Sequence, residues 1–146
     1  MSTHITIFGA TSGIGQCAVE EALRRNHTAR AFARSAGDMT ARPGLEPFPG
    51  DARDPANVAE ALRGTDAVIY ALGIKESVSM LWKEVTLFSK TTRILLDAMQ
   101  TAGVSRLVAV TGFGAGRSRS AMSSVESLGT RPSWAAPTPT RTGRRR

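Results

Sequence analysis

Three glycines near the N-terminus have the spacing of a phosphate-binding turn, because they stand between a short apolar segment, residues 4–8, and a helical pattern. Gly9 would let the chain turn sharply, Gly13 would let the backbone approach a pyrophosphate, and Gly15 would let the next helix pack closely on the strand. The free amides and positive dipole end of that helix would then face the anion. The pattern predicts a dinucleotide ligand, with a purely structural glycine turn as the alternative; the predicted contacts are Gly9, Thr11, Ser12, Gly13, Ile14 and Gly15.

An arginine follows at the expected end of a second strand, 25 residues after Gly9. NAD-binding proteins commonly place an acidic residue there for the ribose hydroxyls, whereas an arginine suits the 2′-phosphate of NADP. Ser35 could add a hydroxyl donor. Arg34 therefore favours NADP over NAD as the cofactor, and the alternative is a solvated arginine at a strand end.

Two later segments fall at the expected ends of further strands. Asp51 is placed to accept a hydrogen bond from the adenine amino group, but it could equally form a turn. Gly73 would let the backbone pass close to the cofactor, and a plain turn explains it nearly as well. The further predicted cofactor contacts are therefore Asp51, Ala52, Ala71, Leu72 and Gly73.

These residues need a scaffold in which strands and helices alternate. The sequence predicts strands at residues 4–8, 28–33, 45–50, 67–72 and 106–111, and helices at residues 13–25, between Asp54 and Gly64, and at residues 84–102. Such alternation gives parallel strands joined by right-handed crossovers, and thus a doubly wound, Rossmann-like α/β sheet. Analogy with that fold gives the strand order 3-2-1-4-5, with the ligand beyond the carboxyl ends of the strands. Because Pro47 and Pro49 cannot donate to a ladder, the third strand should lie at an edge.

Helical spacing also predicts which side chains face the core. For the first helix the predicted inward residues are Ile14, Cys17, Ala18, Ala22 and Leu23, which makes the only cysteine a small core residue rather than a reactive thiol. For the second helix they are Val58, Ala61 and Leu62, and for the third Val85, Phe88, Leu95, Leu96 and Met99. Asp54 and Pro55 have the types expected at a helix start, and Gly103 suits a helix end.

The positive charge is concentrated at the C-terminus. Residues 117–146 hold seven of the 19 basic residues and one of the 12 acidic ones, so they carry +6 of the net charge of +7. We expect one domain over residues 1–118 and a basic, low-complexity, disordered tail over residues 119–146. A nucleic-acid partner is disfavoured because the tail lacks interleaved aromatic residues, Trp134 being isolated among Ser, Ala and Pro.

The N-terminus lacks the basic region of a signal peptide, and no apolar run has the 18 or so residues that a membrane span needs. A single cysteine cannot form an internal disulfide, which fits a reducing compartment. The sequence therefore predicts a cytoplasmic protein without a membrane partner, and it contains no metal-binding motif.

Several motifs in a fixed order resemble one known family. The glycine turn, Ala33-Arg34-Ser35, Gly50-Asp51-Ala52-Arg53-Asp54, Ala71-Leu72-Gly73 and residues 106–112 are similar to segments of the NmrA-like and biliverdin-reductase-B-like group of atypical short-chain dehydrogenases/reductases. The resemblance covers about residues 3–118. It implies an NAD(P)-binding Rossmann domain from a family whose members reduce flavins, quinones or related carbonyl compounds, or only sense the cofactor.

The classical Tyr-x-x-x-Lys pair of that superfamily is absent, because Tyr70 has Ile74 four residues on. The resemblance instead puts Thr111 near the nicotinamide, as a candidate catalytic hydroxyl; the alternative is a strand-end threonine that satisfies local backbone groups. We expect the cofactor domain of an NADPH-dependent oxidoreductase that transfers hydride to an unknown flavin, quinone or carbonyl substrate. The alternative is a non-catalytic NADP-sensing regulator.

The family pattern stops after the fifth strand. Relatives continue with at least one more helix and strand, so we expect a truncated version in which residues 121–146 are read out of frame, with a natural basic extension as the alternative. In either case the apolar fifth strand would leave an open sheet edge through which the protein could self-associate.

Overall fold

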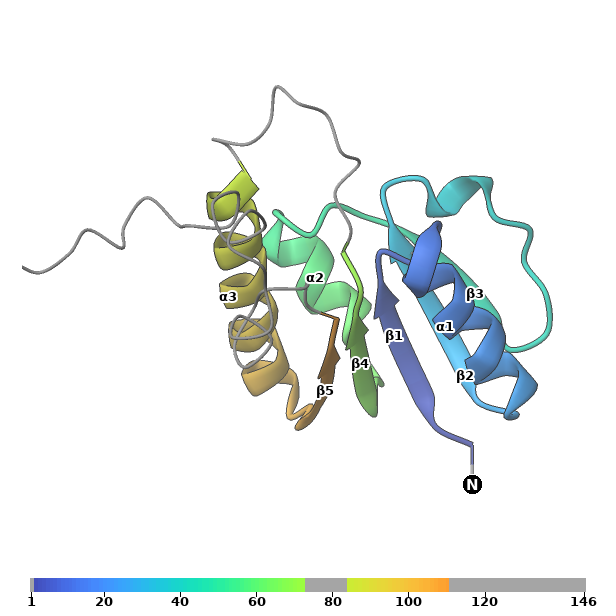
Figure 1. The fold of residues 1–146 in the computed structure, drawn as a ribbon. Coiled ribbons are helices and arrows are strands. Elements are labelled where there is room, and N and C mark those ends of the chain that lie inside the picture. Colours follow the sequence, from blue (N-terminus) through green and yellow to red (C-terminus); the bar gives the residue numbers. More distant parts are fainter. Residues whose placement is uncertain (1, 73–83, 111–146) are drawn as a thin grey trace, which may run out of the picture. The chain divides into compact units, whose positions relative to one another are not determined.

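The structure, a computed structural model, describes residues 2–72 and 84–110, all of which belong to one compact unit. Along the chain the elements are β1 (His4–Phe8), α1 (Gly13–Arg24), β2 (Thr28–Ala33), a short 3-10 helix η1 (Ala36–Asp38), β3 (Leu45–Pro49), α2 (Pro55–Ala61), β4 (Ala67–Tyr70), α3 (Glu84–Ala102) and β5 (Arg106–Ala109) (Figure 1). The predicted boundary between residues 118 and 119 lies outside the described residues.

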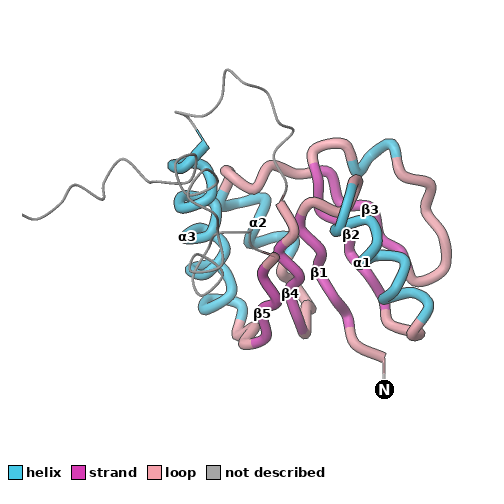
Figure 2. Tube along the Cα trace, viewed as in Figure 1, coloured by secondary structure: helices cyan, strands magenta, loops and turns pink. Residues whose placement is uncertain are grey.

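The five strands form one parallel sheet in the order β3-β2-β1-β4-β5, which confirms the predicted topology. Helix α1 covers one face, and α2 and α3 cover the other, as expected of a doubly wound sheet (Figure 1). In the central strands Phe8 lies opposite Phe32 and Tyr70. This register brings the carboxyl ends of β1, β2 and β4 together, and Figure 2 shows the loops after β1 and β2 at the upper end of the sheet, opposite the N-terminus.

Two apolar layers hold the helices on the sheet. On the α2 and α3 side, the rings of Phe8 and Phe32 meet with centroids 4.5 Å apart. Val58 and Ala61 of α2, and Leu62 at its C-cap, pack there as predicted. On the α1 side, small side chains predominate; the buried ones are Ile7, Ala10, Val19, Ala22, Ala29, Ala31 and Leu45. Small residues let α1 approach the sheet closely.

The predicted inward face of α1 is wrong at two positions. Cys17 is exposed, and the Ile14 side chain is 61% exposed. The buried residues of the helix are Gly15, Val19 and Ala22. A Cβ on Gly15 would lie 2.1 Å from the carbonyl oxygen of Gly9, so this contact fixes the helix with the glycine, not the isoleucine, against the loop.

The predicted inward face of α3 is only partly right. Leu95 and Met99 are buried in the core, whereas Phe88 is 37% and Leu96 is 48% exposed. Val85 lies outside the residues whose side chains are described. The helix ends as predicted, with Gly103 in the left-handed conformation at φ 71°.

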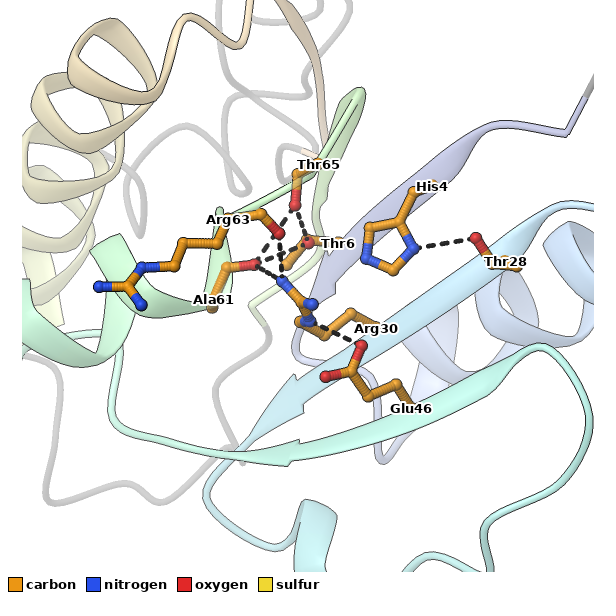
Figure 3. A network of polar contacts seen from close by, with 8 residues as sticks. All are labelled: His4, Thr6, Thr28, Arg30, Glu46, Ala61, Arg63 and Thr65. Atoms are coloured by element: carbon orange, nitrogen blue, oxygen red, sulfur yellow. Dashed lines mark hydrogen bonds and ion pairs between the residues drawn. The ribbon is translucent and has the colours of Figure 1, made fainter.

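A partly buried polar network joins β1 and β2 to the end of α2 (Figure 3). Thr6 Oγ1 donates to the carbonyl oxygen of Ala61 at 3.1 Å and contacts Thr65 Oγ1 at 2.7 Å. Arg30 Nη1 donates to the carbonyls of Ala61 and Arg63, and Arg30 Nε donates to Glu46 Oε2 at 3.0 Å. These donors satisfy carbonyls that the end of a helix leaves without intrahelical partners.

Candidate dinucleotide-binding site

The loop between β1 and α1 owes its shape to a close contact with β4. Gly9 has φ 79°, a backbone conformation that residues other than glycine rarely adopt. A Cβ at this position would lie 2.4 Å from the carbonyl oxygen of Ala71. The Gly9 amide donates to the carbonyl of Phe32 at 2.9 Å, and the Ala71 amide donates to that of Phe8 at 3.0 Å. Gly9 is therefore required by the fold itself.

Gly13 differs from Gly9 because its surroundings are open. It also has a positive φ, 54°, but a Cβ added to it would meet no atom of residues 2–72 and 84–110 within 4 Å. No packing contact among these residues explains a glycine here. The open space in front of Gly13 lets a ligand approach the backbone closely, which is the role that the pyrophosphate-binding pattern assigns to this position.

The N-terminus of α1 presents backbone donors. Ser12 is the N-cap residue, yet its side chain makes no capping hydrogen bond, and the first turn contains no acidic residue. Gln16 is the residue whose amide donates to the Ser12 carbonyl, at 3.3 Å. The amides of Gly13, Ile14 and Gly15 therefore have no intrahelical acceptor and face the side on which an anion would bind.

Helix α2 shows the opposite arrangement. Its N-cap residue Asp54 accepts a hydrogen bond from the Ala56 amide at 2.9 Å, and Pro55 occupies the first turn, as predicted. Asn57 Nδ2 donates to Asp54 at 2.8 Å. A carboxylate thus fills the N-terminus of α2, whereas that of α1 is left for an external acceptor.

The end of β2 meets the glycine loop. Ser35 Oγ donates to Thr11 Oγ1 at 3.1 Å, which links the two segments. Arg34 is exposed and forms no ion pair or hydrogen bond within the part of the chain that the structure describes. A guanidinium without a protein partner therefore lies one residue from the serine that contacts the loop.

Asp51 forms a tight pair with Arg53. Its carboxylate accepts hydrogen bonds from the Arg53 amide at 2.9 Å and from Arg53 Nε at 3.0 Å. These bonds, with a smaller contribution from the positive charge of Arg34, lower the pKa of Asp51 to about 2. The Asp51 amide donates to Asn57 Oδ1 at 3.0 Å, so this residue does form the turn that leads into α2. An acceptor role toward adenine stays a prediction.

The remaining predicted contacts lie at the same end of the sheet or outside the description. Ala71 is buried beside Gly9, and Ala52 and Leu72 are partly buried against the core on the α2 side. Gly73 and Thr111 lie outside the described residues. Sequence reasoning missed Asn57, although an amide side chain three residues after an N-cap Asp is a usable signal.

Tyr70 has a structural role. Its side chain is 6% exposed, and its hydroxyl oxygen lies 2.6 Å from Thr91 Oγ1 of α3. Within residues 2–72 and 84–110 there is no cluster of three or more His, Cys, Asp or Glu side chains suited to a metal ion. No helix in these ranges is long and apolar enough to cross a bilayer.

The sequence profile of an NAD(P)H-binding family matches residues 9–137. Sterol demethylase protein B from Methylococcus capsulatus (strain Bath) is 32% identical over 120 residues, which are 79% of this chain and 35% of that protein. Among solved structures, a protein from Burkholderia pseudomallei that is named as an exported protein is 35% identical, with a TM-score of 0.59 over 77% of this chain and 49% of the other. ChuY, an anaerobillin reductase from Escherichia coli O157:H7, is 28% identical, with a TM-score of 0.66 over 86% of this chain and 59% of the other.

The chain thus spans from about a third to three fifths of the length of these proteins. The family profile covers the glycine loop from Gly9 and the elements from α1 to β5, and the ligand class of that family is a nicotinamide dinucleotide. The open backbone at Gly13 and the unfilled donors of α1 fit the pyrophosphate of such a ligand.

Proposed function

This chain belongs to the NAD(P)H-binding family of Rossmann-like domains, and from that premise we propose that it binds NADP(H) in preference to NAD(H). The observation that carries the proposal is Arg34, an exposed guanidinium without a protein partner in the described ranges, at the end of β2. A guanidinium can donate two parallel hydrogen bonds to a phosphate. The adenosine 2′-phosphate is the group that distinguishes NADP from NAD.

The rest of the site divides between two parts of the nucleotide. The loop from Gly9 to Gly15, through its amides and the hydroxyls of Thr11 and Ser12, holds the pyrophosphate. Ser35 supports Arg34 through its hydrogen bond to Thr11. Asp51 and Ala52 line the adenine, and the backbone of Ala71, Leu72 and Gly73 passes the nicotinamide half.

We assign the domain to an NADPH-dependent oxidoreductase that reduces a flavin, a quinone or a carbonyl compound. The bound nicotinamide supplies the hydride, and the chain binds and orients it. The 28% identity to a protein named as an anaerobillin reductase supports a reductase. Thr111 is the candidate hydroxyl beside the nicotinamide.

A second function has an observation in its favour. Tyr70, the only tyrosine of this sequence, is buried with its hydroxyl oxygen 2.6 Å from Thr91 Oγ1, so its hydroxyl does not serve as the acid of a tyrosine–lysine pair of the kind found in classical short-chain dehydrogenases. An NADP sensor that binds the nucleotide without turning it over needs no such pair. The two functions share the cofactor site and differ only in turnover.

Calorimetric titration of the full chain with NADPH and, separately, NADH tests the cofactor proposal. We expect NADPH to bind at least about tenfold more tightly, because a charge-assisted contact contributes about 1.5–3 kcal/mol. Equal affinities would contradict the NADP preference, and binding of neither nucleotide would contradict the site.

Turnover decides between the two functions. NADPH is mixed with the protein and a panel of flavins and quinones, and absorbance at the NADPH band is followed. Steady oxidation above the rate without protein supports the reductase. Tight binding of NADPH without oxidation of any member of the panel supports the sensor.

We also propose a cytoplasmic location, supported by the exposed thiol of Cys17, the only cysteine of the sequence. Cell fractionation checks it. Recovery of the protein outside the cytoplasm would contradict the proposal and would agree with the name of the Burkholderia relative.

A further inference from the structure

The two edges of the sheet differ in their capacity to pair with another strand. At the β3 edge, the Gly50 amide donates to the carbonyl of Ala33, and the register places Ala33 opposite Pro49. Because strand residues alternate in direction, Leu45, Pro47 and Pro49 are the residues whose backbone points away from β2. Two of them are prolines without an N–H, and the amide of Leu45 donates to the Arg42 carbonyl at 2.9 Å. This edge therefore offers no free amide donor.

The β5 edge is open by the same reasoning. The Val110 amide donates to the carbonyl of Tyr70 at 2.9 Å, and Tyr70 lies opposite Ala109. The backbone groups of Val108 and Val110 thus face β4, whereas those of Leu107 and Ala109 point outward. Within the described residues no strand pairs with this side of β5. Both residues keep an N–H and a carbonyl that a further strand can use.

An exposed apolar side chain accompanies the open edge. Val108 lies opposite Ile69, so both side chains are on the same face of the sheet. This is the face that α1 covers at the other strands. Its side chain is 55% exposed. A partner strand at β5 would satisfy the outward amides and would cover Val108 at the same time.

We propose that the partner strand is β5 of a second copy of this chain, paired antiparallel about a two-fold axis that passes beside Val108. In that pairing Leu107 of each copy lies opposite Ala109 of the other, and each such pair exchanges two hydrogen bonds. The two Val108 side chains meet as a non-hydrogen-bonded pair, in which side chains approach most closely. The exposed edge is self-complementary in backbone donors and in side chains.

Two features favour a second copy over other partners. A two-fold contact buries the same residues on both chains, so the one edge that is open within the described residues of each chain suffices. The sequence that follows in the same chain, residues 119–146, is rich in Ser, Thr, Pro and Arg and lacks the alternating apolar pattern of a strand. The four-residue contact is small, which predicts a weak, concentration-dependent dimer.

The prolines of β3 determine where assembly stops. Once two β5 edges have joined, each remaining outer edge is a β3 edge without free amide donors. The assembly is therefore a closed dimer and does not grow into a fibre. Replacing the prolines should make the β3 edge able to pair with another strand.

Sedimentation velocity of the full chain without nucleotide, over a wide dilution series, tests the proposal independently of cofactor binding. We expect a reversible monomer–dimer equilibrium. A chain that stays monomeric at every concentration would overturn the proposal, and so would a series of species larger than a dimer.

Ala109→Pro removes one outward N–H and leaves the ladder to β4 intact, and Ala109→Thr is the matched control that keeps the N–H. We expect the proline variant to be monomeric and the threonine variant to dimerise. Equal dimerisation of the two variants would show that the β5 edge is not the dimer interface. If circular dichroism shows that Ala109→Pro is unfolded, Val108→Lys replaces it, because it brings two like charges together at the axis without touching the backbone; unchanged dimerisation would then overturn the proposal.

A variant that lacks the β3 prolines tests whether they limit the assembly to a dimer. Pro47→Ala combined with Pro49→Ala restores two outward amides at β3. We expect this variant to form species larger than dimers, whereas the same two substitutions in the Ala109→Pro background should stop at pairs joined through β3. A double variant that remains a dimer would contradict the role of the prolines.

Discussion

The carbonyl oxygen of Ala71 lies 2.4 Å from the point at which a Cβ on Gly9 would stand. The end of β4 and the loop after β1 are therefore in backbone contact. This contact, together with the hydrogen bond from the Gly9 amide to Phe32, gives the loop its shape before any ligand arrives. A site whose geometry is fixed in advance loses less conformational entropy on binding.

Gly9→Ala and Gly13→Ala should separate folding from binding. Gly9→Ala meets both an unfavourable φ and the Ala71 carbonyl, so we expect it to lower the free energy of unfolding by about 3 kcal/mol or to prevent folding. Gly13→Ala meets only the unfavourable φ of 54°, which costs about 1–2 kcal/mol. Its methyl group enters the space in front of the loop, so NADPH affinity should fall at least about tenfold.

Urea unfolding and calorimetry measure the two effects. A stable Gly9→Ala variant would contradict the contact with Ala71. A Gly13→Ala variant with unchanged affinity for NADPH would remove Gly13 from the pyrophosphate site.

Arg34→Asp should reverse the cofactor preference. The substitution removes the cation proposed for the 2′-phosphate and supplies a carboxylate that can accept hydrogen bonds from ribose hydroxyls. We expect NADPH affinity to fall by roughly 10- to 100-fold, with NADH affinity equal or higher. Calorimetric titration with both nucleotides measures this change.

Arg63→Asp is the matched control, because Arg63 is also an exposed arginine but pairs with Glu60 on α2. It should leave both affinities unchanged. If the two variants lose NADPH affinity equally, the effect is one of net charge, and Arg34 has no specific role.

Arg30→Met should destabilise the fold, because the Arg63 carbonyl loses its side-chain donor and the Ala61 carbonyl keeps only the hydroxyl donors Thr6 and Thr65. We expect the free energy of unfolding to fall by about 2 kcal/mol. Glu46→Gln tests the exposed side of the same network and should cost about 0.5 kcal/mol or less, since the Glu46 side chain is 51% exposed. If urea unfolding shows that Arg30→Met and Glu46→Gln lower the free energy of unfolding equally, the effect comes from the ion pair and not from the carbonyls.

The pH dependence of stability should carry a contribution from His4. Burial and, secondarily, the positive charge of Arg30 lower the pKa of His4 below 6.5. Its Nε2 atom is buried and has no hydrogen-bond partner among the described residues, so a proton there would find no acceptor among them. The unfolded chain then binds a proton more readily than the folded one, and stability falls as the pH drops through 6.5 toward the folded-state pKa.

His4→Asn removes this titration and keeps a polar atom for the Thr28 hydroxyl, which lies 2.9 Å from His4 Nδ1. Urea unfolding at about pH 7.5 and about pH 5.5 should show a smaller loss of stability for the variant than for the wild type. An identical loss would assign the pH dependence to other groups.

Most element boundaries could be predicted from the sequence, because glycine turns and prolines act locally. The strand order came from analogy with the doubly wound fold, which the alternation of strands and helices indicates. Pro47 and Pro49 predicted an edge strand, and β3 lies at the edge. The N-cap role of Asp54 was predicted for the same reason.

Predictions failed where a contact between distant residues decides the outcome. Spacing alone placed Ile14 and Cys17 on the inner face of α1, but the approach of Gly15 to Gly9 turns that face toward Val19 and Ala22. The network around Thr6 was not foreseen at all. Its signal is visible only in the register, which places Thr6 opposite Arg30 in neighbouring strands.

Because the first turn of α1 has amides without an intrahelical acceptor, the stability of the folded chain should depend on the concentration of the nucleotide that binds there. A ligand that fills those donors binds the folded chain and not the unfolded one, so at a hundredfold excess over Kd it protects by about 2.7 kcal/mol. Proteases act on opened molecules, and degradation should therefore quicken when the cellular pool of nicotinamide nucleotide runs low. Abundance of the chain would then follow the cell's supply of nicotinamide nucleotide, whether or not the chain catalyses a reaction.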